Sequence, residues 1–231
     1  MEEIATTFAQ KSAVVLMGIK HCGKSTQGRL LAKQFSCSLY DSDDVITEMT
    51  GKTPRELYTQ SGEAAFMAAE ASACNAIAAS IRAACAASAD AAGASMGDAD
   101  TTAPFATSAI RAVVATGGGI CKNEQALAAL RAVGLFVFLN ADEKTAYDRI
   151  VREIGIAENG ALTNLPAYIA KENPQSLNDV RESFHRFFVA RTARYNALSD
   201  ITVLMDATSP EENMQRLITA LQASGELQLT P

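Results

Sequence analysis

Residues 18–25 read Gly-Ile-Lys-His-Cys-Gly-Lys-Ser and constrain the fold of this chain more than any other segment. A glycine, four free positions and then Gly-Lys-Ser is the spacing of a phosphate-binding loop between a strand and a helix. The apolar run of residues 13–17 suits a buried parallel strand, and Leu30, Leu31 and Phe35 recur at helical spacing. The sequence therefore predicts a strand, a loop and a helix that together hold a nucleotide.

The residue types of this loop suit the chemistry of phosphate binding. Gly18 and Gly23 permit backbone angles and close approaches that a side chain would forbid. The loop N–H groups can then converge on phosphate oxygens at the positive end of the helix. Lys24 would reach the β- and γ-phosphates, and the Ser25 hydroxyl would bind Mg²⁺. The remaining candidates of the ATP-binding segment are Cys22, a small residue that fills the loop, and Thr26.

The composition favours a single domain, spanning residues 1–231, without nucleic-acid or membrane partners. The formal net charge of −6 lacks the basic surplus of a nucleic-acid-binding surface, and no segment reaches the roughly 18 uninterrupted apolar residues of a membrane span. Residues 1–12 have no apolar core and do not predict a signal peptide. The five cysteines form no CxxC pair, and their odd number does not indicate a disulfide framework. We expect a cytoplasmic monomer that binds a small molecule.

Residues 38–44 read Ser-Leu-Tyr-Asp-Ser-Asp-Asp and place acidic side chains after a short predicted strand. The carboxyl edge of a parallel sheet is where ligands bind in open α/β folds. Residues two apart in an extended chain point the same way, so Asp41 and Asp43 are both expected to face the phosphates. One carboxylate would order Mg²⁺ and the other would accept a proton from an attacking hydroxyl. The alternative is that Asp43 or Asp44 only caps a helix beginning at Val45.

Three further apolar runs resume the buried-strand pattern, at residues 110–116, 135–139 and 200–205. Helical segments separate them, and a last helix is predicted near Pro210 by a cap residue and a first-turn proline. This alternation predicts a three-layer α/β/α domain with a parallel sheet. Gly117, Gly118 and Gly119 follow one strand, where backbone N–H groups can bind an anion or a substrate hydroxyl, or the glycines simply form a tight turn.

Two other regions have distinct compositions. Alanine dominates residues 64–115, where a helix is plausible to about Arg82 and residues 86–107 read as a flexible surface insertion. The region around residues 150–185 is rich in charge, contains no strand signal and is interrupted by glycine and proline. It suits a mobile helical lid over the phosphates, because phosphoryl transfer benefits from closure and positive charge.

Five motifs in a fixed order give the sequence a family resemblance. They are the phosphate-binding loop, Tyr40-Asp41-Ser42-Asp43, Gly62-Glu63-Ala64-Ala65-Phe66, Ala115-Thr116-Gly117-Gly118-Gly119 and Arg191-Thr192-Ala193-Arg194-Tyr195. In this order they resemble the shikimate kinases over nearly the whole chain except the alanine-rich insertion. The resemblance implies a nucleoside-monophosphate-kinase-like fold with a five-stranded parallel sheet and a helical lid. It also implies MgATP-dependent phosphorylation of a hydroxyl on a small cyclic acid.

The resemblance further implies roles for individual residues. Asp41 would support Mg²⁺ together with Ser25, and Asp43 would hold and activate the substrate hydroxyl. The backbone of residues 117–119 would contact the substrate, and Arg191 would meet its carboxylate. The candidates to flank the adenine are Arg149, Arg152 and Pro210.

Two positions depart from the family pattern. The family has an arginine directly after Gly-Glu-x-x-Phe that binds the substrate carboxylate and a hydroxyl, and here that position is Met67. The family lid carries Arg-Pro-Leu-Leu, whose arginine contacts the transferring phosphate, whereas the nearest match here begins with Leu165. Losing a bidentate arginine forfeits a charge-assisted pair worth about 1.5–3 kcal/mol.

Three functions are therefore compatible with the sequence. The first is shikimate kinase activity with a rearranged carboxylate site. The second is a kinase of the same fold that acts on another small hydroxylated metabolite. The third is a non-catalytic nucleotide-binding regulator, against which the intact Lys24, Ser25, Asp41 and Asp43 argue.

Overall fold

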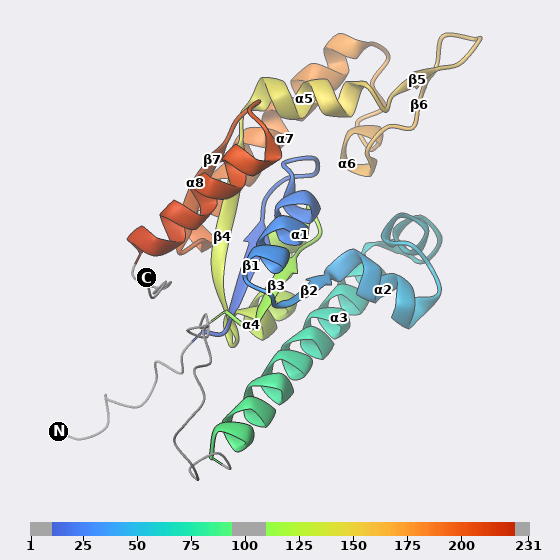
Figure 1. Ribbon diagram of the computed structural model, residues 1–231. Helices are drawn as coiled ribbons and strands as arrows, with labels where there is room; N and C mark the ends of the chain where they lie inside the picture. Colours follow the sequence, from blue (N-terminus) through green and yellow to red (C-terminus); the bar gives the residue numbers. More distant parts are fainter. Residues whose placement is uncertain (1–10, 94–109, 225–231) are drawn as a thin grey trace, which may run out of the picture.

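Five parallel strands form the centre of the computed structural model, which describes residues 11–93 and 110–224 (Figure 1). Their order across the sheet is β2-β3-β1-β4-β7. The strands are β1 (Ala13–Met17), β2 (Ser38–Asp41), β3 (Ala112–Ala115), β4 (Gly134–Ala141) and β7 (Ile201–Met205). Each coincides with a predicted strand segment, so the predicted α/β fold with a five-stranded parallel sheet is confirmed.

The central strands are buried on both faces, which is why their sequences read as continuous apolar runs. In the register, Leu16 lies opposite Ala115 on one side and Val137 on the other, and Asp41 lies opposite Ala115. The loops that follow β1, β2 and β3 therefore leave the same edge of the sheet. This edge carries the candidate site.

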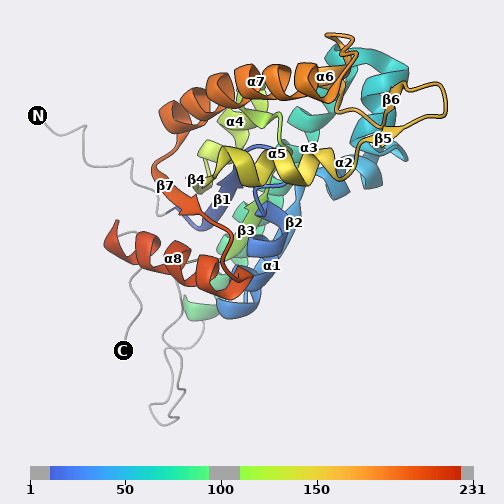
Figure 2. The same cartoon turned by 90° about the horizontal axis from the view of Figure 1, so that it is seen from above.

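Helices cover both faces of the sheet and complete three layers (Figure 2). One face is covered by α1 (Lys24–Gln34) and α8 (Pro210–Ala223), which pack on each other. The other is covered by α4 (Glu124–Arg131) and α7 (Leu177–Leu198). Ser209 and Glu212 form a capping box with Pro210 at the start of α8, as the sequence predicts for this helix.

The segment of acidic residues after β2 differs from its prediction. The strand ends at Asp41, and α2 (Ser42–Thr50) begins at once, so Asp43 lies in the first helical turn and not in an extended strand. The cap of this helix is Asp41, whose Oδ1 accepts a hydrogen bond of 3.1 Å from the Asp43 N–H. The expectation that Asp43 or Asp44 caps a helix beginning at Val45 is therefore wrong, because Asp41 supplies the cap three residues earlier.

The longest helix, α3 (Pro54–Gly93), continues well beyond the predicted end near Arg82. Its backbone is non-helical at Gly62, where φ is 83°. Alanine has the highest helix propensity, which explains how residues 86–93 of the predicted insertion remain helical. The rest of that insertion, residues 94–107, lies outside the described part of the chain.

Within the described residues, α3 has the length and apolar composition needed to cross a membrane over Pro54–Ala87. Its side chains Cys74, Ile77 and Ile81 are nevertheless part of the protein core. Packing inside the domain accounts for the apolar face of this helix.

The lid region is more structured than the sequence indicates. After α5 (Glu143–Val151), the strands β5 (Gly155–Ile156) and β6 (Leu162–Thr163) form a small antiparallel pair, followed by α6 (Ala167–Ala170). Such two-residue strands leave too short a pattern to recognise in a sequence. Two contacts join this region to α3: Arg55 Nη1 donates to Asn164 Oδ1 at 2.6 Å, and Lys171 pairs with Glu63 at 3.2 Å.

Candidate active site

The phosphate-binding loop has the geometry that its glycines predict. A Cβ added to Gly18 would lie 2.8 Å from the carbonyl oxygen of Leu139, and Gly23 has a φ of 101°. Side chains other than glycine are disfavoured at both positions, by collision at the first and by backbone strain at the second. The Lys24 ammonium is held by the carbonyl oxygens of Gly18 (2.9 Å) and Ile19 (2.8 Å), so it lies at the mouth of the loop.

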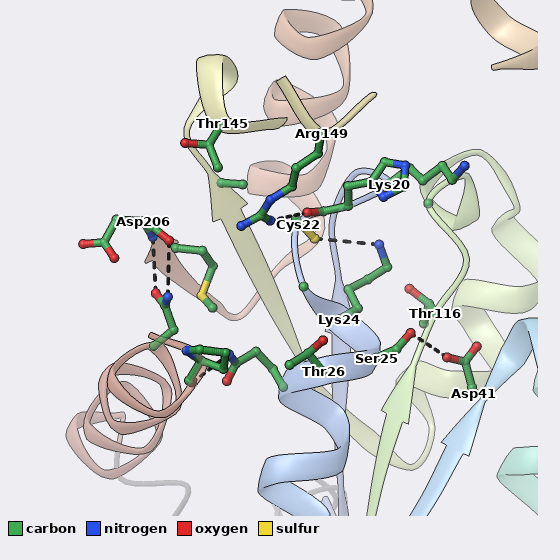
Figure 3. A pocket seen from close by; sticks show the side chains of 18 of the residues that line it. Lys20, Cys22, Lys24, Ser25, Thr26, Asp41, Thr116, Thr145, Arg149 and Asp206 are labelled. Carbon is green, nitrogen blue, oxygen red and sulfur yellow. Dashed lines mark hydrogen bonds between the residues drawn. The ribbon is translucent and has the colours of Figure 1, made fainter. Parts of the chain in front are cut away.

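The predicted metal-binding residues form a pair. Ser25 at the start of α1 donates its hydroxyl hydrogen to Asp41 Oδ2 at 2.8 Å, as Figure 3 shows. Hydroxyl and carboxylate oxygens are ligands that Mg²⁺ accepts, and Mg²⁺ in such sites is also held by substrate phosphates. Among the described residues, no group of three or more His, Cys, Asp or Glu side chains could hold a metal alone. The donor set therefore fits a cation that arrives with a nucleotide.

Asp43 lies mostly buried beside this pair. Desolvation raises its pKa to about 6, with a further contribution from the Asp41 carboxylate, while the Lys24 ammonium acts in the opposite direction. A carboxylate with a pKa near the working pH is suited to accept a proton from an attacking hydroxyl. Burial thus gives Asp43 a property that the sequence motif alone does not specify.

An open pocket of about 670 Å³ joins the loop to the far side of the site. Among the residues that line it are eight of the predicted ATP-binding residues, namely Cys22, Gly23, Lys24, Ser25, Thr26, Arg149, Arg152 and Pro210. Gly18, the ninth, does not line the pocket. In Figure 3, Arg149 lies across the pocket from Asp41, and its Nη1 donates to the His21 carbonyl oxygen at 2.5 Å. The loop, the end of α5 and the start of α8 therefore share one cavity.

The predicted substrate-binding residues divide into two sets. Asp43 and Gly118 line the pocket, whereas Gly117, Gly119 and Arg191 lie outside its wall. Arg191 Nη1 donates to the Gly118 carbonyl oxygen at 3.4 Å and approaches the Cys121 sulfur at 3.0 Å.

The glycine turn is fixed from two sides. The Tyr195 hydroxyl donates to the same Gly118 carbonyl at 3.0 Å, and the tyrosine ring stacks on Phe138. From the other side, the Ser42 hydroxyl accepts a hydrogen bond of 2.9 Å from the Gly117 N–H. The turn is therefore held by α7 and α2 at a defined position beside Asp43.

Sequence reasoning missed one charged residue of this region, Glu70 on α3. Its side chain is buried, and Asn123 Nδ2 donates to its Oε2 at 2.9 Å and to the Met67 carbonyl at 2.8 Å. The available signal was a lone acidic residue in an alanine-rich helix, three positions after Met67. Such a residue usually lies on a solvated face, so only the tertiary structure reveals its burial.

A protein-family model described as shikimate kinase matches residues 20–88 and 99–222. The chain belongs to the shikimate kinase family. The interruption of the match falls within the alanine-rich insertion, where the sequence resemblance also fails.

Individual shikimate kinases are distant relatives. The shikimate kinase of Xanthomonas campestris pv. campestris (strain 8004) is 25% identical over 218 residues, covering 94% of this chain and 96% of the relative. That of Symbiobacterium thermophilum is 25% identical over 213 residues, covering 92% and 98%. The solved shikimate kinase of Acinetobacter baumannii in complex with shikimate superimposes with a TM-score of 0.63 at 19% identity, covering 92% of this chain and 93% of that one. The fold of the shikimate kinases is thus shared over nearly the full length of both chains.

Proposed function

We propose that this shikimate kinase family member transfers the γ-phosphate of ATP to a hydroxyl of shikimate. The observation that carries the proposal is the convergence of Lys24, the Ser25–Asp41 pair and Asp43 on one pocket. Each has the residue type that phosphoryl transfer requires. The family match supports the same reaction class.

In the proposed reaction, Asp43 accepts the proton of the attacking hydroxyl while Lys24 stabilises charge on the transferring phosphate. Arg149 and Arg152 flank the nucleotide from the end of α5, and Pro210 closes the opposite wall. The acceptor lies between Asp43 and the glycine turn, with its carboxylate directed to Arg191.

MgATP supplies the phosphoryl group and the cation that neutralises its charge. Ser25 and Asp41 would hold the Mg²⁺ ion, because their oxygens are adjacent and belong to the hard ligands that this cation prefers. The loop N–H groups would hold the phosphates at the N-terminus of α1.

A second candidate is a kinase of the same fold that acts on another small hydroxylated metabolite. It is favoured by Met67 and Leu165, which stand where the shikimate kinase resemblance implies arginines. Leu165 is a partly buried apolar side chain that packs against the core, so it cannot replace a cation.

The test is an acceptor panel. ADP release is measured with MgATP and shikimate, sugar acids, polyols, amino-acid alcohols and nucleoside monophosphates. We expect shikimate to give turnover. Turnover on another compound alone would replace the proposal with the second candidate, and no turnover by a folded protein that binds ATP would favour a regulatory role.

We further propose a cytoplasmic monomer without nucleic-acid or membrane partners. All five cysteines are free thiols, consistent with a reducing compartment. Gel filtration with light scattering tests the oligomeric state, and a dimer would contradict it.

A further inference from the structure

Glu70 is a buried carboxyl group that the proposed reaction does not use. Its residue is 1% exposed, on the part of α3 that faces the glycine turn. Oε2 accepts the hydrogen bond from Asn123, whereas the buried Oε1 has no hydrogen-bond partner within the described chain. Unpartnered buried oxygens are rare, and each one calls for a ligand, a water or a functional role.

The free oxygen points to the same place as the proposed catalytic base. A Cβ added to Gly117 would lie 3.2 Å from Glu70 Oε1 and 2.9 Å from Asp43 Oδ1. Both oxygens therefore border one small space, which the lack of a side chain at position 117 keeps open. This explains a requirement for glycine at the first position of the triplet, independent of its backbone angles.

A purely structural role does not explain a carboxyl group here. Asn123 needs only a hydrogen-bond acceptor, and a glutamine amide would supply one without burying a charge. Burial raises the pKa of Glu70 to about 7, the Asp43 carboxylate adds to this rise, and the Arg191 guanidinium lowers the pKa. Two carboxyl groups that disfavour each other's ionisation are costly to keep adjacent unless a ligand uses them.

We propose that Glu70 Oε1 binds a second hydroxyl of the acceptor, adjacent to the hydroxyl that Asp43 activates. The inference rests on the proposed kinase function and adds to it a substrate class, namely acceptors with neighbouring hydroxyls. Two oxygens that border one space are matched by two donor groups on adjacent carbons. An acceptor carboxylate would be repelled from this corner and remains with Arg191, so Glu70 and Arg191 together orient the molecule.

The experiment uses the full chain with the acceptor that the panel identifies and with its deoxy analogues. Each analogue lacks one hydroxyl that is not phosphorylated. For the intact acceptor, Glu70→Gln should lower kcat/KM about tenfold or more, because a hydrogen bond to a charged group is lost, while the KM for ATP stays within about twofold. For the analogue that lacks the adjacent hydroxyl, the wild type and Glu70→Gln should have equal kcat/KM. The wild-type acceptor KM should also depend on pH near 7, and that dependence should be absent in the variant.

Glu48→Gln is the matched control, since it makes the same change at an exposed position of α2. Equal losses for the intact acceptor and every analogue would overturn the inference, because they would indicate a structural effect. If the panel gives no turnover, the proposed function fails separately, and calorimetric binding of the same compounds decides the role of Glu70. Binding that is tenfold weaker in Glu70→Gln supports it, whereas equal binding or none overturns it.

Discussion

The two halves of the active site are built in different ways. The donor half consists of the phosphate-binding loop with Asp41, and most of its contacts are made by one short segment and its own backbone. The acceptor half combines Asp43, Glu70 and Arg191 from α2, α3 and α7 around the glycine turn. The donor half has every residue type expected of the family, whereas the acceptor half has Met67 in place of an arginine.

This difference has a physical cause. A phosphate is bound largely by backbone N–H groups, whose geometry is set by glycine spacing and the start of a helix. A small acceptor is instead recognised by a few converging side chains. Such side chains can be replaced individually without altering the fold. Predictions about the two halves test whether they are as separable as the structure indicates.

The largest expected effect is on the chemical step. Asp43→Asn removes the proton acceptor and should lower kcat about 10²–10⁴-fold, with little change in the KM for ATP. Because the pKa of Asp43 is raised to about 6, wild-type activity should fall as the pH drops below about 6 and Asp43 becomes protonated. Steady-state kinetics across pH measure both effects. Asp44→Asn, an exposed neighbour, is the control, and a loss below tenfold in Asp43→Asn would contradict the assigned role.

A somewhat smaller loss is expected in the donor half. Lys24→Ala removes a charge that stabilises the transferring phosphate and should lower kcat about 10²–10³-fold. Unlike Asp43→Asn, it should also raise the KM for ATP. Lys33→Ala changes an exposed lysine of the same helix and should leave both constants unchanged. An unaltered KM for ATP in Lys24→Ala would show that the two halves are not separable in this way.

Glu70 should make the acceptor half less stable as the pH rises. Its pKa is raised from 4.5 to about 7, so between these values the folded chain retains a proton that the unfolded chain has lost. Folding stability therefore falls through this window. Glu70→Gln should be more stable than the wild type by about 2 kcal/mol at pH 8 and equally stable at pH 4. Urea unfolding at the two pH values measures this, and a pH-independent difference would refute the electrostatic cause.

The smallest expected change concerns acceptor choice. Met67→Arg restores the cation implied by the family resemblance and should lower the KM for shikimate about tenfold, in line with one charge-assisted pair. The new guanidinium would lie three residues before Glu70 on α3, where side chains meet. Met49→Arg, at an exposed site on α2, controls for the added charge. A higher KM for shikimate in Met67→Arg would favour the second candidate function.

Periodicity and turn residues were sufficient to predict the five strands and their parallel arrangement. The failures were local. The strand after residue 38 was extended too far because Asp41 caps a helix that competes with it, and α3 was ended too early because its alanines were assigned to an insertion. The lid strands were missed because two residues carry no periodic signal.

By itself, the sequence determined the nucleotide half of this protein, because a glycine-spaced loop between a strand and a helix specifies its own backbone geometry. It also determined which side chains leave the carboxyl edge of the sheet. Only the tertiary structure decided that Asp43 is buried enough to shift its pKa and that Glu70, 27 residues further along the chain, has a free oxygen beside it. Desolvation and the meeting of distant helices depend on packing, which no local pattern records.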